Sequence, residues 1–234
     1  MRLLVTRPEP DATRTAQALR QRGHEALVAP LLSTQTVEAD FAGPYGGVLL
    51  TSANAARAVS SHPRASELTR LPAFTVGARS AEAAHAAGFG DVASAGGALG
   101  DLVRLVAARF AGSRIRLLYL AGEDRSGDLA RELAAHGVAV DTVVIYRAVA
   151  AQRLPAELVQ ALSGERPDGA LHYSRRSVTT LIALAKQAGV LNAVRNLAHY
   201  CLSDEVAAPL REAGAAQISL ASRPDEGALF GLIR

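Results

Sequence analysis

Residues 47–52 read Gly-Val-Leu-Leu-Thr-Ser, and residues 169–174 read Gly-Ala-Leu-His-Tyr-Ser. Each stretch is a short apolar run that ends in hydroxyl side chains and leads into a helix-like segment. Short apolar runs of this kind are typical of strands buried on both faces of a parallel sheet. The match between the two stretches indicates that a strand–helix block occurs twice in the chain.

A second pair of matching stretches lies at residues 2–4 and 116–118, which both read Arg-Leu-Leu. A helix-like segment follows each of them and ends at Gly23 and Gly137, respectively. The two kinds of block alternate along the chain. Strands alternating with helices predict the α/β class, with two Rossmann- or flavodoxin-like domains and a ligand cleft between them. Contiguous domains divided near residue 112 and interleaved domains both fit this block order.

Composition excludes several classes of protein. The 234-residue chain has a net charge of +3 and a single cysteine, Cys201, which excludes an intramolecular disulfide and fits a cytoplasmic protein. Its apolar runs are too short to span a bilayer, and we expect neither a signal peptide nor a membrane partner. No basic stretch is interleaved with aromatic residues, so nucleic-acid binding is not expected.

Motifs for metals, nucleotides and nucleophiles are missing as well. The histidines do not show H-x-x-x-H spacing, no G-x-G-x-x-G follows a strand, and no serine lies in a G-x-S-x-G context. Schiff-base chemistry would depend on Lys186, the only lysine, which lies in a helix-like stretch. We therefore expect no metal and no cofactor.

Four expected strand ends lead directly into helices, at residues 51–54, 76–80, 173–177 and 202–204. A helix N-terminus offers free N–H groups and the positive end of the helix dipole, so it attracts carboxylates and phosphates. The serines at these positions can equally serve as simple helix caps. Two further strand ends, at residues 6–8 and 121–125, carry arginines that can reach an anion.

Six motifs, taken in order, resemble the uroporphyrinogen-III synthase family. They are Leu-Val-Thr-Arg-Pro at 4–8, Thr-Ser-Ala-Asn-Ala at 51–55, Val-Gly-Ala-Arg-Ser-Ala at 76–81, Leu-Ala-Gly-Glu-Asp-Arg at 120–125, Val-Val-Ile-Tyr-Arg at 143–147 and His-Tyr-Ser-Arg-Arg-Ser at 172–177. The resemblance implies a lyase of porphyrin (haem) biosynthesis that needs no cofactor. Such an enzyme takes the linear tetrapyrrole hydroxymethylbilane, removes its hydroxyl as water, inverts ring D through a spiro-type intermediate and closes uroporphyrinogen III.

The resemblance also implies interleaved domains. Residues 1–33 and 150–234 would form the first α/β domain, and residues 38–143 the second. Residues 34–37 and 144–149 would be the two strands that connect them. We expect a monomer whose ligand is a small polycarboxylate.

The family's pattern implies particular site residues. Tyr146 matches a tyrosine that assists departure of the hydroxyl, although an aromatic residue that only packs at a strand end remains an alternative. Ser80 stands where many members have threonine, whereas Val206 leaves the corresponding position of the other domain without a hydroxyl. The candidate substrate contacts are Arg7, Thr51, Ser52, Asn54, Gly77, Ser80, Gly122, Ser174, Arg175 and Ser203.

Two other classes of protein compete with this interpretation. The first is a non-catalytic two-lobed module that binds tetrapyrroles or small anions; the presence of Tyr146 and Ser80 favours the enzyme over it. The second is a transferase or sugar-phosphate enzyme on a Rossmann-like fold. It would need a glycine-rich nucleotide loop, which residues 96–100 resemble only loosely.

Overall fold

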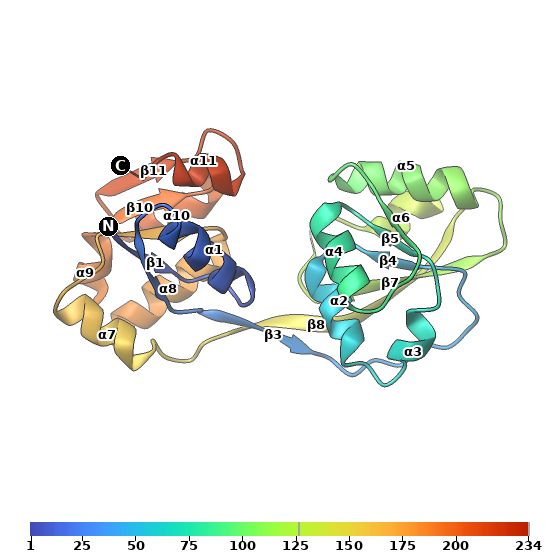
Figure 1. Ribbon diagram of the computed structural model, residues 1–234, viewed down its shortest axis with the longest axis horizontal. Coiled ribbons are helices and arrows are strands. Elements are labelled where there is room, and N and C mark those ends of the chain that lie inside the picture. The colour runs from blue at the N-terminus through green and yellow to red at the C-terminus, as the bar shows by residue number, and fades with distance from the viewer. Residues whose placement is uncertain (126, 234) are drawn as a thin grey trace. The chain divides into compact units, whose positions relative to one another are not determined.

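The computed structural model describes residues 1–125 and 127–233 and consists of two compact units (Figure 1). Unit 1 comprises Met1–Ser33 and Val149–Arg234, and unit 2 comprises Thr34–Ala148. Each unit contains a sheet built mainly of parallel strand pairs. The predicted α/β class with two parallel sheets is therefore confirmed. No helix within the described residues is both long and apolar enough to cross a membrane.

Unit 1 is built on a five-stranded sheet of order β11-β10-β9-β1-β2. Its strands are β1 (Arg2–Val5), β2 (Glu25–Val28), β9 (Gly169–His172), β10 (Ala198–Cys201) and β11 (Gln217–Leu220). Its helices are α1 (Asp11–Arg20), α7 (Ala156–Ser163), α8 (Arg175–Gln187), α9 (Leu191–Arg195), α10 (Asp204–Glu212) and α11 (Glu226–Phe230).

Unit 2 is built on the sheet of order β3-β8-β7-β4-β5-β6. The strands are β3 (Leu32–Thr36), β4 (Val48–Leu50), β5 (Ala73–Thr75), β6 (Val92–Ser94), β7 (Arg116–Gly122) and β8 (Ala139–Ala150). The helices are α2 (Ala53–Ser60), α3 (Ala65–Leu68), α4 (Ala78–Ala86), α5 (Leu99–Phe110) and α6 (Leu129–Ala134).

The two sheets share one strand order, which reflects the internal duplication. Unit 1 reads β2-β1-β9-β10-β11, and unit 2 reads β8-β7-β4-β5-β6 before β3 is added at the edge. The two Arg-Leu-Leu stretches begin β1 and β7, while the other repeated stretch forms β9 and β4. The chain order reverses between β1 and β9 in one sheet and between β7 and β4 in the other. Doubly wound sheets bind their ligands at this reversal, beyond the carboxyl ends of the strands.

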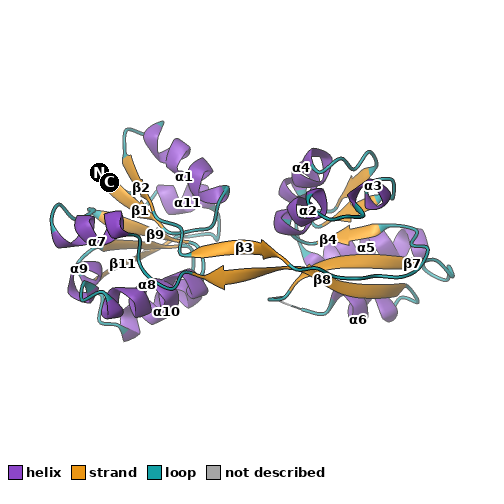
Figure 2. Cartoon of the chain, turned by 90° about the horizontal axis from the view of Figure 1, so that it is seen from below, coloured by secondary structure: helices purple, strands orange, loops and turns teal. Residues whose placement is uncertain are grey.

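Alternation of side chains along the strands of unit 2 creates two cores. Val48 and Leu50 pack with α2 and α4 on one face, whereas Leu49 and Phe74 pack with α5 and α6 on the other. Figure 2 shows the two pairs of helices on opposite sides of the strands. Because both faces are buried, β4 reads as a continuous apolar run.

The chain passes between the units twice, within β3 and at the end of β8. These strands are neighbours and run antiparallel, because Val37 N donates to Ile145 O at 2.8 Å and Ala151 N donates to Leu31 O at 2.9 Å (Figure 2). Residues 34–37 and 144–149, the two expected connecting strands, are therefore extended and paired with each other.

Candidate active site

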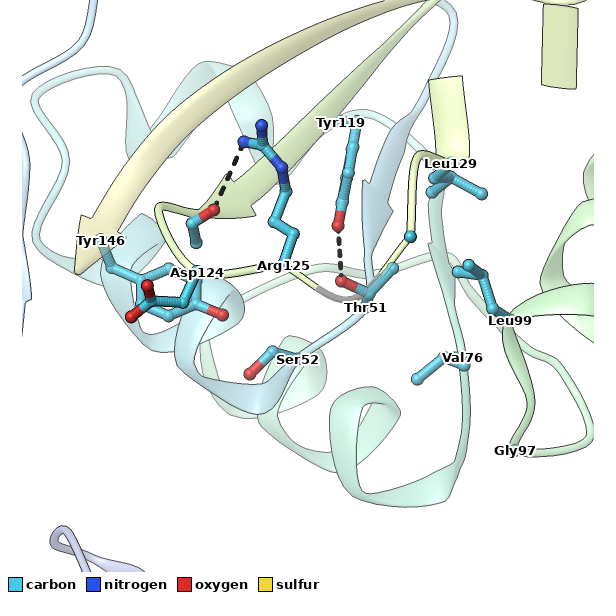
Figure 3. A pocket seen from close by; sticks show the side chains of 12 residues that line it. Thr51, Ser52, Val76, Gly97, Leu99, Tyr119, Asp124, Arg125, Leu129 and Tyr146 are labelled. Carbon is cyan, nitrogen blue, oxygen red and sulfur yellow. Dashed lines mark hydrogen bonds between the residues drawn. The ribbon is translucent and has the colours of Figure 1, made fainter. Parts of the chain in front are cut away.

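A cavity of about 360 Å³ lies in unit 2 where the strand order reverses between β4 and β7 (Figure 3). Residues that follow β4, residues at the end of β7 and the tyrosine of β8 surround it. The lining residues are Thr51, Ser52, Val76, Gly97, Leu99, Tyr119, Gly122, Asp124, Arg125, Gly127, Leu129 and Tyr146. Four predicted site residues, Thr51, Ser52, Gly122 and Tyr146, thus meet at the place where such folds bind ligands.

A β-bulge sets the position of Tyr146. Ala121 pairs with Val144, but the next residue of β7, Gly122, pairs with Tyr146. Ile145 is therefore skipped in this ladder, and its carbonyl accepts a hydrogen bond from Val37 instead. Bulges re-aim side chains at strand ends, as this one does for Tyr146.

The ring of Tyr146 lies directly against the backbone of Gly122. A Cβ atom at residue 122 would lie 2.6 Å from Cζ of Tyr146 and 2.7 Å from its hydroxyl oxygen. Such distances do not occur between non-bonded atoms, so only glycine leaves room for the ring here. The predicted importance of Gly122 therefore has a steric basis: it lets Tyr146 lie over the end of β7.

The environment of Tyr146 keeps its hydroxyl protonated. Burial raises the pKa of the phenol, and the charges of Tyr119 and Asp124 raise it further, while a hydrogen bond with the Ser52 side chain lowers it. The net shift of the Tyr146 pKa is upward. At neutral pH the side chain is thus a neutral phenol that can donate a hydrogen bond into the cavity.

Ser52 has two roles. Its Oγ accepts from the backbone N–H of Asn54 at 3.1 Å and so caps α2, while its side chain also bonds Tyr146. The neighbouring Thr51 Oγ1 lies 2.9 Å from the hydroxyl of Tyr119. The capping role and a functional role of Ser52 are therefore compatible.

The other predicted residues of unit 2 lie near the cavity but do not line it. Gly77 is the N-cap of α4, and a Cβ there would lie 3.3 Å from Cα of Gly97, a lining residue. Ser80 lies in the first turn of α4 and is buried. The side-chain oxygen of Asn54 accepts from Arg57. Gly77 and Ser80 thus shape the start of α4, which borders the cavity.

Ser174 and Ser203 of unit 1 cap adjacent helices. Ser174 accepts from Ser177 N at 3.2 Å at the start of α8, and Ser203 accepts from Val206 N at 3.4 Å at the start of α10. They follow the parallel strands β9 and β10, which pair in register. The two helix N-termini therefore lie at one edge of the sheet, with the exposed Arg175 as the first residue of α8.

Arg7 lies at the reversal point of unit 1, but carboxylates of this unit surround it. Its guanidinium bonds Glu226 at 2.9 Å and Asp11 at 3.1 Å and stacks on the ring of Tyr173 at 4.0 Å. The same Glu226 oxygen accepts from Thr15 at 2.6 Å and from Tyr173 at 2.8 Å. This network joins α1 and α11 to the sheet, and the contact of Arg7 with substrate stays a prediction.

The structure also bears on metal binding and on thiol chemistry. Within residues 1–125 and 127–233, no cluster of three or more His, Cys, Asp or Glu side chains is placed to hold a metal ion. Cys201 is fully buried in β10, and burial raises the pKa of its thiol to about 12, so the thiol is not an activated nucleophile.

Sequence reasoning missed two polar residues of the cavity. Tyr119 lies inside the apolar strand β7, where only knowledge of the facing strand identifies it as a partner of Thr51. The sequence indicates Asp124 only as a partner for Arg125, although it lines the cavity beside Tyr146.

Comparisons with known proteins place the chain in a family. It matches the family model described as "Uroporphyrinogen-III synthase HemD" over residues 13–231. It is similar to uroporphyrinogen-III synthetase from Helicobacter pylori, with a TM-score of 0.65 and 17% identity over 99% of this chain and 98% of that chain. It is also similar to a mutant uroporphyrinogen III synthase from Thermus thermophilus, with a TM-score of 0.50 and 18% identity over 99% and 97% of the two chains. No curated protein matches it. The structural similarities show the fold, and the family match extends over most of the sequence: the chain belongs to the uroporphyrinogen-III synthase family.

Proposed function

We propose that this chain cyclises hydroxymethylbilane to uroporphyrinogen III as a hydro-lyase, with loss of water and inversion of ring D. Its family membership makes it an enzyme that acts on a tetrapyrrole. The observation that supports the chemistry most directly is the cavity in which the hydroxyl of Tyr146 is held protonated beside Ser52.

The first step is rupture of the carbon–oxygen bond of the terminal hydroxymethyl group. The pyrrole nitrogen shares its electron pair with the methylene carbon, and the oxygen takes up a proton and leaves as water. Hydroxide is a poor leaving group, so a donor at the departing oxygen lowers the barrier. Tyr146 supplies that hydrogen bond because burial keeps its phenol neutral.

The remaining cation then reacts with ring D. Attack by a ring carbon forms the spiro-type intermediate, which reopens with the ring inverted and closes the macrocycle. The protein must hold the chain in the conformation that permits this attack, because the unassisted cation closes without inversion to isomer I. Positioning is therefore as important as acid assistance.

Binding of the carboxylates is assigned to helix N-termini. Ser52 and Gly77 begin two helices in unit 2, and Ser174 and Ser203 begin two in unit 1. Each charge-assisted hydrogen bond contributes about 1.5–3 kcal/mol, so several contacts share the binding energy. Thr51, Asn54, Ser80 and Arg175 are kept as further candidate contacts.

The proposal includes three finer statements about the protein. We propose that it acts as a cytoplasmic monomer, a location that its single cysteine favours. We also propose that it acts without a cofactor and that nucleic acid is not a partner, since the sequence lacks the corresponding motifs.

The test is to supply freshly made hydroxymethylbilane and to separate the product isomers. An active enzyme gives isomer III faster than the spontaneous formation of isomer I. The competing candidate, a non-catalytic tetrapyrrole-binding module, would bind the substrate and leave only isomer I. That result would reject the proposed function.

Ser52→Ala and Ser174→Ala should both weaken turnover without abolishing it. Each change removes a helix cap, which costs about 0.5–2 kcal/mol of stability. Ser52→Ala should be the more harmful to kcat, because Ser52 also bonds Tyr146. Steady-state kinetics with thermal melting measure both effects. Complete loss of activity in a folded Ser52→Ala protein would instead point to a serine nucleophile.

Gly122→Ala should displace Tyr146 and lower kcat by about 10²-fold, the usual cost of a 1 Å misplacement. The added methyl group would occupy the space of the Tyr146 ring. The matched control is Gly90→Ala, because a Cβ at this exposed glycine has no atom within 4 Å. Equal activity in the two variants would show that the position of the Tyr146 ring is not critical.

A further inference from the structure

One residue of the cavity conflicts with its expected ligand. Asp124 lines the cavity, yet the proposed substrate is a polycarboxylate that this side chain repels. Among the lining residues that the structure describes, Asp124 is the only one with a carboxylate. A side chain that weakens binding of the substrate can still raise the rate, provided that it stabilises the transition state more than the bound substrate.

Asp124 lines the cavity together with Tyr146, the residue proposed to assist departure of the hydroxyl. It belongs to the segment that follows β7, two residues after Gly122, against which the Tyr146 ring packs. Figure 3 shows its carboxylate in the same region of the cavity as Tyr146. Its negative charge raises the pKa of the Tyr146 hydroxyl, so the two groups interact electrostatically. The adjacent Arg125 side chain bonds the carbonyl of Gly122 at 3.4 Å.

The chemistry creates a positive charge at this place. When the carbon–oxygen bond breaks, the electron pair leaves with the oxygen, and the methylene carbon and pyrrole nitrogen share a positive charge. A carboxylate next to this positive charge stabilises it by direct attraction, and water screens part of the attraction because the Asp124 side chain is exposed.

We propose that the Asp124 carboxylate is the counter-charge that stabilises the cation formed when the hydroxyl leaves. No bond to Asp124 forms or breaks in this role. The inference rests on the proposed function and extends it by assigning an electrostatic residue to the site. Tyr146 assists departure of the oxygen, and Asp124 stabilises the positive charge that the oxygen leaves behind.

This role has an unusual kinetic consequence. Asp124 repels the anionic substrate in the ground state and attracts the cation that follows. Asp124→Asn should therefore lower KM and kcat together, a combination that marks an interaction unfavourable to substrate and favourable to the transition state. A residue that only maintains the fold would not tighten substrate binding when replaced.

The experiment compares Asp124→Asn with Glu123→Gln. Glu123 is the neighbouring carboxylate, which is exposed as Asp124 is but does not line the cavity. We expect kcat of Asp124→Asn to fall by about 10- to 10²-fold, KM to fall about 2-fold or more, and isomer I to increase. Glu123→Gln should behave as the wild type, and Asp124→Glu should recover part of kcat. Circular dichroism and thermal melting confirm that each variant is folded.

The possible results distinguish a failure of the proposed function from a failure of the role proposed for Asp124. If the wild type gives no isomer III, the proposed function fails. If the wild type is active but Asp124→Asn matches Glu123→Gln, or raises KM without lowering kcat, the counter-charge role is rejected and the proposed function stands.

Discussion

Tyr146→Phe should slow turnover by about 10²-fold and shift the product from isomer III towards isomer I. General acid assistance is usually worth about 10²–10⁴-fold, and the lower end applies because the pyrrole nitrogen already helps to expel the oxygen. The substrate also closes unaided without inversion. A slower enzyme therefore loses substrate to isomer I, so the isomer ratio reports on the chemical step as well as the rate.

Phenylalanine separates the chemical role of Tyr146 from a packing role. It keeps the ring that lies over Gly122 and removes only the hydroxyl that bonds Ser52. The matched control is Tyr45→Phe, because the Tyr45 hydroxyl donates to Asp141 at 3.0 Å in the same unit but outside the cavity. Wild-type rate and isomer purity in Tyr146→Phe would leave this tyrosine as a packing residue only.

The elements that the sequence predicted well are those whose signal is local. The run Val48–Leu50 is apolar throughout because both faces of its sheet are covered, and the serine that follows caps the next helix. Parallel strands bring their carboxyl ends to one edge, so Thr51 and Gly122 meet although they are far apart in sequence. The position of the site can therefore be predicted once the strands and their order in the sheet are known.

Features that depend on tertiary contact were not predictable in this way. The helices α3 and α9 have only four and five residues, lack side-chain N-caps and carry too short a pattern to be recognised. The contact between Arg7 and Glu226 could not be predicted, because the two residues lie 219 positions apart along the chain. The bulge that aims Tyr146 is a property of strand pairing and has no signature within β8.

The two reversal points differ in the polar side chains that follow their strands. In unit 2 the space beyond β4 and β7 is lined by hydroxyls, Asp124 and Arg125. In unit 1 the residues that follow β1 and β9, Arg7 and Tyr173, bind the carboxylate of Glu226 from α11. The two halves share a strand order, while their polar residues have diverged.

A buried histidine pair next to this edge of unit 1 predicts a steep acid instability. His172 and His199 are both fully buried, and His172 Nε2 lies 2.9 Å from His199 Nδ1. His199 Nε2 lies 3.0 Å from the carbonyl of Val194, which can only accept. His199 Nε2 therefore carries the proton, and its Nδ1 accepts from His172 Nε2. In this arrangement His172 Nδ1 has no hydrogen-bond partner among the described residues, and both rings fit it in the neutral form.

Protonation of either ring would place a positive charge in the buried interior, away from water. Burial lowers the pKa of His199 to about 4, and burial together with the neighbouring ring lowers the pKa of His172 well below its usual value. Both rings titrate near 6.5 in the unfolded chain, so below that pH the unfolded state binds more protons than the folded state. Stability is therefore complete above about pH 6.5 and is lost as the pH falls towards 4.

The expected loss at pH 5 is on the order of 2 kcal/mol for His199, and His172, whose pKa is lowered in the same direction, adds to it. Urea unfolding at pH 7 and pH 5 measures it. In His199→Asn, the free energy of unfolding should depend less steeply on pH, by about one proton, even if the variant is less stable than the wild type. His136→Gln, which replaces an exposed histidine, should leave the pH dependence unchanged. Ring resonances of the wild type provide a check that needs no variant, because two histidines should remain neutral at pH 5. Two buried histidines that titrate near pH 6.5 in the folded protein would contradict the prediction.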